Sequence, residues 1–178
     1  ERVLWNPART GIIQALNRMG AGLKPARLHR QGPEVTADFT VVPKPLKAVT
    51  VRPAEVPSLI DELPILMVIA TQAKGKSWFH GVEELRVKET DRVASMVGQL
   101  QKMGARIGVK GDSVWVDGPT PLHAASIESF GDHRTAMSFI VAGMIATGQT
   151  RVRDTACIAT SFPNFFALLK QAGVVLGR

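Results

Sequence analysis

The hydrophobic positions of the chain follow two alternating helical patterns. The first is amphipathic, with apolar residues three or four apart on one face. Its three copies are Gly11 to Ala21, Val93 to Ala105 and Phe165 to Val174. Each copy carries a glycine near its end, where a left-handed residue after the helix is favoured. We therefore expect three glycine-terminated surface helices, each followed by a short strand.

The second pattern is apolar on nearly every side. It covers Leu63 to Ala73 and Ala136 to Thr147. A helix without a polar face belongs in the interior of a domain. The longest apolar run, Met137 to Ala146, is far shorter than the roughly 18–20 residues that span a bilayer. We therefore expect two buried helices and no membrane segment.

Short strand-like runs lie between the helical patterns, separated by turns rich in proline and glycine. The expected strands are Phe39–Val42, Ala48–Val51, Ser77–His80, Ser113–Val116 and Thr150–Arg153. Helix pairs that recur with strands predict an α/β (α+β) fold of about two repeat units and a partial third. No segment resembles a linker, so residues 1–178 are expected to form a single domain.

Three charged clusters stand at the expected helix starts. They are Ile60–Glu62, Lys88–Arg92 and Gly131–Arg134. If the repeat units are related by symmetry, these helix starts converge on one side of the domain. Helix N-termini carry partial positive charge and unpaired N–H groups, which suit an anion.

The acidic residues of these clusters have two explanations. Asp61, Glu89 and Asp132 would each be favoured in a first helical turn as capping residues. Carboxylates placed among cations are also candidates for proton transfer. The residues alone indicate an enzyme that acts on an anionic substrate, with Asp61 and Glu89 as its acid/base candidates.

The cations are harder to explain by structure alone. Lys88 and Arg92 are four apart, so on one helix they would repel each other by roughly 0.2–0.5 kcal/mol. His133 and Arg134 stand at the end of a helix whose dipole disfavours cations. A bound anion would reverse the sign of these contributions. This pattern therefore favours an anion site.

The composition agrees with an anionic partner. The chain has 22 lysine and arginine residues against 15 acids, a net charge of +7. The basic residues form no tract and are not interleaved with aromatic residues, which disfavours nucleic acid as the partner. The one cysteine, Cys157, excludes an internal disulfide, fits a reducing compartment and is expected to be a buried structural thiol. The start at Glu1 shows no signal peptide and indicates a piece of a longer protein.

Several longer motifs resemble the 5-enolpyruvylshikimate-3-phosphate synthase family. They are Asn6–Gly11, Ile60–Pro64, Arg86–Arg92, Gly131–Ser138 and Asp154–Pro163, in the family's order. The likeness runs from about Val3 to the C-terminus and looks like most of the C-terminal half of such an enzyme. It implies a fold of two similar halves, each made of three βαβαββ units with buried helices, that meet at an active-site cleft.

The resemblance also implies a function. Members transfer the enolpyruvyl group of phosphoenolpyruvate to the 5-hydroxyl of shikimate 3-phosphate in aromatic amino acid biosynthesis. They are cytoplasmic in bacteria and need no metal or organic cofactor. Carried onto this chain, Asp61 is the base beside the reacting hydroxyl, and Glu89 handles the proton of the phosphoenolpyruvate methylene. The residues that hold the phosphate and carboxylate, where glyphosate also binds, are Lys88, Arg92 and Arg134, with His133 nearby.

Two departures from the family limit these expectations. Many members carry a lysine in the segment where this chain has Ile158–Pro163. The segments that bind shikimate 3-phosphate belong to the N-terminal half, which is missing here, so the chain alone is expected to be folded but inactive. Three alternatives stay open: a transferase that acts on UDP-N-acetylglucosamine, a basic nucleic-acid-binding module, and a domain of a multifunctional shikimate-pathway polypeptide.

Overall fold

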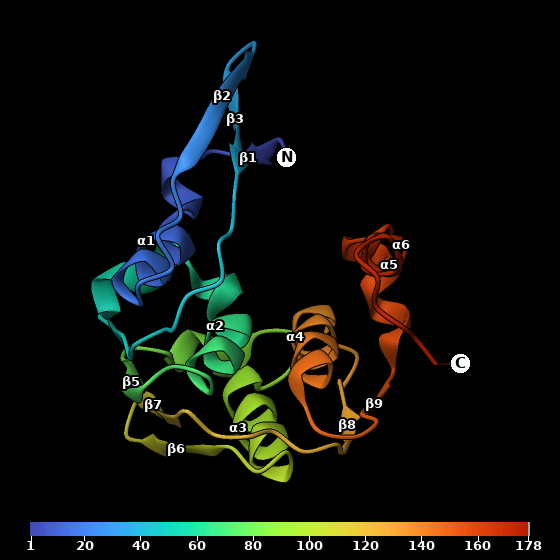
Figure 1. The fold of residues 1–178 in the computed structure, drawn as a ribbon. Helices are drawn as coiled ribbons and strands as arrows, with labels where there is room; N and C mark the ends of the chain where they lie inside the picture. Colours follow the sequence, from blue (N-terminus) through green and yellow to red (C-terminus); the bar gives the residue numbers. More distant parts are fainter. Residues whose placement is uncertain (178) are drawn as a thin grey trace.

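The computed structural model describes residues 1–177 and arranges small sheets around a group of central helices (Figure 1). The strands are β1 (Val3–Leu4), β2 (Pro25–Gln31), β3 (Glu34–Phe39), β4 (Thr50–Val51), β5 (Gly75–Phe79), β6 (Arg106–Lys110), β7 (Ser113–Gly118), β8 (Ser126–Glu128) and β9 (Arg151–Arg153). The α-helices are α1 (Gly11–Arg18), α2 (Leu63–Ala70), α3 (Arg92–Lys102), α4 (His133–Ile145), α5 (Ile158–Ser161) and α6 (Phe165–Gln171). The 3-10 helices are η1 (Pro7–Arg9), η2 (Pro53–Ser58), η3 (Ile60–Glu62), η4 (Glu83–Val87) and η5 (Thr155–Cys157).

The order of the elements contains one complete βαβαββ unit, formed by β4, α2, β5, α3, β6 and β7. In its sheet, β4 and β5 are parallel, and β7 lies antiparallel between β5 and β6. The last four elements of this unit, β5, α3, β6 and β7, are repeated near the N-terminus by β1, α1, β2 and β3, and β1 pairs with β3 as β5 pairs with β7. The first four elements, β4, α2, β5 and α3, are repeated near the C-terminus by β8, α4, β9 and α6, and β8 is parallel to β9 as β4 is to β5. The predicted repeat is thus one complete unit between two partial ones.

The prediction of two buried helices is confirmed for α2 and for the first part of α4, whereas Met144 and Ile145 at the end of α4 are 49% and 50% exposed. α2 and α4 pack against each other, and α2 also contacts β7 (Figure 1). Leu63, Leu66 and Met67 of α2 expose no surface, and Phe139 of α4 exposes none. Removing side chains of this size from water stabilises a fold by about 1.5–3 kcal/mol each. This burial therefore holds the helix starts in place.

The three glycine-terminated helices are also confirmed, and each ends three residues before the predicted end. Gly20, Gly104 and Gly173 have φ angles of 98°, 89° and 84°. A residue with a Cβ atom is strained in this region, so the sequence pattern identified the helix ends correctly. Strands follow the first two glycines, whereas residues 173–177 form none.

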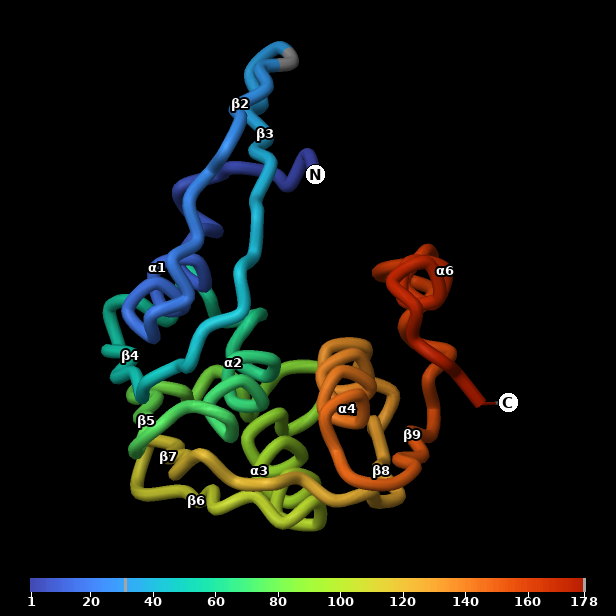
Figure 2. The backbone as a smooth tube through the Cα atoms, in the orientation of Figure 1, coloured from blue at the N-terminus to red at the C-terminus, as the bar shows by residue number. Residues whose placement is uncertain are grey.

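Most strand predictions hold in part, but Phe39–Val42 is wrong because only Phe39 belongs to a strand. Val41 and Val42 are 70% and 57% exposed and lead into a segment interrupted by Pro43 and Pro45, which lack the N–H that a ladder needs. The strands are instead β2 and β3, a hairpin that projects from the body (Figure 2). The hairpin was not predicted because its strands contain many basic and acidic residues and form no apolar run. The short strands β1 and β8 were not predicted either.

In the C-terminal segment, η5 and α5 contact α4, whereas α6 lies away from the central helices (Figure 2). α6 buries none of its residues, and Leu168 on its apolar face is 47% exposed. Cys157, in η5, is only half-buried, so the expectation of a buried thiol is wrong. Its Sγ donates a hydrogen bond to the carbonyl oxygen of Asp154 at 3.1 Å. Within residues 1–177, no helix is long and apolar enough to cross a membrane.

Candidate functional site

Ion pairs bring the starts of three helices together. Asp61 lies in η3, directly before α2; Arg92 is the first residue of α3; and Asp132 precedes α4 as its N-cap. Arg92 Nη2 lies 2.9 Å from Asp132 Oδ1, and Arg92 Nη1 lies 3.6 Å from Asp61 Oδ1. The three clusters that the sequence places at helix starts therefore form one charged site.

Arg92 is the centre of this site, with a side chain only 1% exposed. Its Nε and Nη2 donate to the two carboxylate oxygens of Asp132 at 3.0 and 2.9 Å, and Nη2 also donates to Glu89 Oε2. Burial acts to lower the pKa of Arg92, but the Asp132 carboxylate outweighs it, so the pKa is raised. Arg92 Nη1 is buried and has no hydrogen-bond partner among residues 1–177.

Asp132 also caps α4. Its oxygens accept hydrogen bonds from the backbone N–H groups of Arg134 and Thr135 at 3.2 Å each, and from Thr135 Oγ1 at 2.6 Å. Burial acts to raise the pKa of Asp132, but the hydrogen bonds from Arg92 and Thr135 lower it overall. Capping is therefore the correct explanation for Asp132. Asp61 does lie in the first turn of η3, but its side chain caps no helix. The explanation is wrong for Glu89, since α3 begins at Arg92 and is capped by Asp91.

Asp61 is surrounded by arginines. Its Oδ2 accepts a hydrogen bond from Arg9 Nη2 at 2.9 Å and lies 3.2 Å from Arg134 Nη2. Arg134 Nη1 also donates to the Asp61 carbonyl oxygen at 3.0 Å. Partial burial acts to raise the pKa of Asp61, but the charge of Arg134 and the Arg9 hydrogen bond lower it overall. The carboxylate is therefore ionised at neutral pH and held in a fixed position.

Arg9 is the site residue that sequence reasoning missed. It belongs to η1, which Asn6 caps by accepting a hydrogen bond from the Ala8 N–H at 3.0 Å. Its guanidinium also lies 3.4 Å from Glu62 Oε1. The signal was present, because Arg9 lies in the motif Asn6–Gly11, but its distance of 52 residues from Asp61 hides the contact.

Replacing Arg9 should change the titration of Asp61 more than the stability of the chain. In Arg9→Gln we expect the pKa of Asp61 to rise, because one hydrogen bond and one positive charge are lost. Since Arg9 is 48% exposed, the free energy of unfolding should fall by less than about 1 kcal/mol. Carboxyl-detected NMR titration measures the first effect. Arg18→Gln, which removes the remote pair with Glu55, is the control and should leave Asp61 unchanged.

The cations expected to need an anion are balanced by carboxylates instead. Lys88 lies outside the helix that begins at Arg92, and its Nζ pairs with Glu84 Oε1 at 2.7 Å, so the predicted repulsion between Lys88 and Arg92 on one helix is wrong. His133 is 17% exposed, with Nδ1 3.9 Å from Asp132 Oδ1. An anion that binds here has to displace carboxylates from arginines. Among residues 1–177, no group of three His, Cys, Asp or Glu side chains could hold a metal ion.

Comparison with solved structures defines the class of protein. The enolpyruvyl transferase NikO from Streptomyces tendae superposes with a TM-score of 0.65 at 22% identity, over 93% of this chain and 35% of that chain. A likeness at this identity shows the fold alone. The chain therefore has the enolpyruvyl transferase fold, as expected.

Comparison of sequences defines the family. The profile of the family described as EPSP synthase (3-phosphoshikimate 1-carboxyvinyltransferase) matches residues 1–169. A 3-phosphoshikimate 1-carboxyvinyltransferase of Anaeromyxobacter sp. (strain Fw109-5) is 47% identical over 92% of this chain and 38% of that protein. The EPSP synthase of Acinetobacter baumannii superposes with a TM-score of 0.91 at 37% identity, over 96% of this chain and 40% of that chain. The chain belongs to the EPSP synthase family, and it spans about 40% of the length of these relatives.

Proposed function

We propose that the chain is part of an enzyme that transfers the enolpyruvyl group of phosphoenolpyruvate to the 5-hydroxyl of shikimate 3-phosphate and releases phosphate. The observation that carries this proposal is the site where Arg92, Arg134 and Asp61 meet at the starts of three helices. It combines donors for a doubly anionic substrate with carboxylates that can move protons. The family membership favours this substrate over UDP-N-acetylglucosamine and over nucleic acid.

In this proposal the arginines bind the phosphate and carboxylate of phosphoenolpyruvate. Arg92 Nη1 lies near Asp61 Oδ1 but has no hydrogen-bond partner among residues 1–177, so it can donate to the substrate. Arg134 Nη2 becomes available when the substrate replaces Asp61 as its partner. Lys88, whose side chain is 26% exposed, adds a mobile charge by leaving Glu84. His133 stands at the N-terminus of α4, where an anion is stabilised by the helix dipole.

The two carboxylates have different proton-transfer roles. Asp61 accepts the proton of the attacking 5-hydroxyl, and Glu89 exchanges the proton at the phosphoenolpyruvate methylene. Asp61 is a weak base while three arginines surround it. A bound phosphate neutralises part of their charge, which raises the pKa of Asp61 and strengthens it as a base when the substrate is present. Glu89 is half-exposed, and within residues 1–177 its side chain is held by Arg92 alone, so it can turn toward the substrate.

We propose further that residues 1–178 form one domain, most of a C-terminal half, that other parts of the polypeptide complete. The repeat supports this view, because the part of the third unit that the structure describes, up to residue 177, contains no hairpin equivalent to β6 and β7. In the complete unit, that hairpin follows α3 and β7 pairs with β5. The equivalent hairpin would pair with β9 and cover the exposed face of α6. The absent N-terminal half would supply the binding site for shikimate 3-phosphate.

Complementation in trans tests both proposals. We expect the chain alone to release no phosphate from the two substrates. When the chain is mixed with the unmatched part of the Anaeromyxobacter relative, the rate of phosphate release should exceed that of either piece alone by at least about 100-fold. Phosphate release measures function, and size-exclusion chromatography measures association. Association without turnover would contradict the reaction, whereas no association would contradict the docking.

A matched pair of variants tests where the second piece docks. Leu168 is 47% exposed in this chain, so Leu168→Glu should leave its folding intact and still prevent association. Lys170→Gln, on the same helix, should associate normally. Equal association of both variants would contradict docking on the apolar face of α6.

A further inference from the structure

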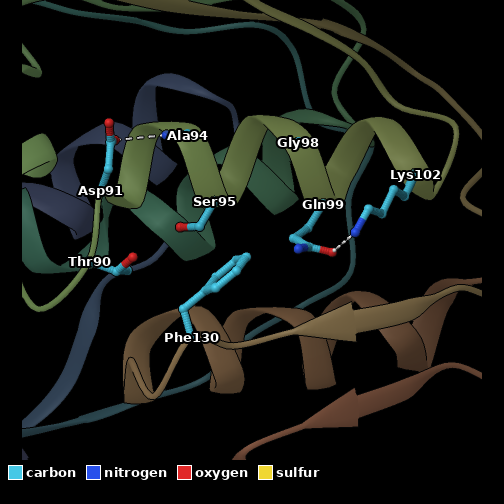
Figure 3. Close-up of a pocket in the computed structure, with 8 residues that line it drawn as sticks. All are labelled: Thr90, Asp91, Ala94, Ser95, Gly98, Gln99, Lys102 and Phe130. Atoms are coloured by element: carbon cyan, nitrogen blue, oxygen red, sulfur yellow. Dashed lines mark hydrogen bonds between the residues drawn. The ribbon is translucent and has the colours of Figure 1, made fainter.

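A groove of about 320 Å³ runs along one face of α3, beside the charged site but formed by other residues (Figure 3). Ala94 and Gly98 line it from the helix, and Phe130 lines it from the loop before α4. Ser95, Gln99 and Lys102 add polar groups on the same side of the helix. None of these side chains belongs to the ion-pair network around Arg92.

The groove is open because the connection before α4 is short. Between β4 and α2 the chain runs through residues 52–62, where η2 packs against α1. At the equivalent place between β8 and α4 it has only residues 129–132. α3 is therefore left without such a cover. Phe130 has a left-handed φ of 56° and is 52% exposed, and its ring lies opposite α3 (Figure 3).

Gly98 keeps the groove open, although nothing in the structure requires a glycine there. A Cβ atom at this position would meet no atom within 4 Å. Glycine in the interior of a helix costs about 1 kcal/mol relative to alanine. The sequence thus accepts a less stable helix at the position where a side chain would occupy the groove.

Gln99 places a side-chain amide along the groove. Gln99 is only 3% exposed, and its Oε1 accepts a hydrogen bond from Lys102 Nζ at 3.1 Å. This bond fixes the orientation of the amide, so that Nε2 faces the side of Phe130 (Figure 3). Nε2 is not one of the buried side-chain atoms that lack a hydrogen-bond partner within residues 1–177, so it is reached from the open groove. An acceptor atom in the groove can therefore accept a hydrogen bond from it without the amide moving.

We propose that this groove binds a small organic monoanion with a flat apolar body. Its carboxylate accepts hydrogen bonds from Gln99 Nε2 and from the Lys102 ammonium, while its ring lies over Gly98 against Phe130. The volume is at the lower end of the range of small-molecule sites, roughly 300–1,000 Å³. Asp91 stands at the other end of the groove, roughly 16 Å along the helix from Lys102. Its negative charge disfavours a second anionic group there.

The test uses 3-phenylpropionate as the probe and amide NMR of the 178-residue chain as the readout. We expect saturable shifts at Gly98, Gln99 and Phe130. The neutral isostere 3-phenylpropionamide should bind at least about tenfold more weakly, because it loses the charge-assisted hydrogen bonds. Saturating inorganic phosphate should leave the probe's affinity unchanged, since phosphate would bind at the arginines and not in this groove.

Two variants decide whether the groove is the site. Gly98→Leu fills it and should abolish the saturable shifts without lowering the thermal midpoint, because leucine is the better helix former. Gln99→Met keeps the volume, removes the donor and should weaken probe binding by about tenfold. Shifts that do not saturate, or that persist in Gly98→Leu, would overturn the proposal. So would equal affinity for the acid and the amide.

Discussion

Asp132→Asn should lower the free energy of unfolding by about 3–5 kcal/mol, the cost of breaking a buried ion pair from one side. Asp132 exposes none of its side chain and Arg92 exposes 1%. The substitution leaves the Arg92 charge without its bidentate partner. Glu89 does not replace that partner because its side chain is 52% exposed. Urea unfolding followed by circular dichroism measures the change.

Asp91→Asn is the matched control. Asp91 caps α3 as Asp132 caps α4, but its ion pair with Arg86 is exposed, so the cost should be below about 1 kcal/mol. Asparagine is a good cap at both positions, which isolates the effect of the buried charge. A cost for Asp132→Asn as small as that of Asp91→Asn would show that the buried pair does not stabilise the chain.

The stability that the Asp132–Arg92 pair contributes should decrease as the pH is lowered. The pKa of Asp132 is lowered in the folded chain from its ordinary value of 3.8. Its contribution to the free energy of unfolding is therefore fully present above about pH 4 and is lost as the pH falls through the folded-state pKa. Asp132→Asn removes this titrating group. The difference in stability between the original chain and the variant should consequently shrink below pH 4.

Glu89→Gln should lower turnover by about 100-fold or more while substrate binding persists, if Glu89 exchanges the methylene proton. The amide keeps the shape of the side chain and cannot take up a proton. The measurement is steady-state phosphate release by the chain completed with the unmatched part of a relative. We expect a fall in kcat with little change in KM for phosphoenolpyruvate.

Glu83→Gln is the control for this experiment. Glu83 is exposed in η4, on the same approach to α3, and takes no part in the ion pairs of residues 1–177. It should retain full turnover. If Glu89→Gln also retains it, Glu89 has no proton-transfer role. A rise in KM with unchanged kcat would instead make Glu89 a residue that orients Arg92.

The helices could be predicted because their signals are local. An all-apolar run such as Leu63–Ala70 has to be buried wherever the rest of the chain lies, and glycine at 104 ends a helix by its own backbone freedom. The β2–β3 hairpin could not be predicted in this way. Its strands have few apolar residues and are stabilised by pairing with each other, which is a contact between segments.

The same distinction between local signals and contacts between distant segments applies to the candidate site. The sequence by itself determined that charged residues gather at three helix starts, because capping and helix periodicity act within a few residues. Only the tertiary structure decided which charges pair. Arg92 with Asp132 and Arg9 with Asp61 are separated by 40 and 52 residues. Coulomb energy depends on distance in space and on burial, and neither quantity is written in a local pattern.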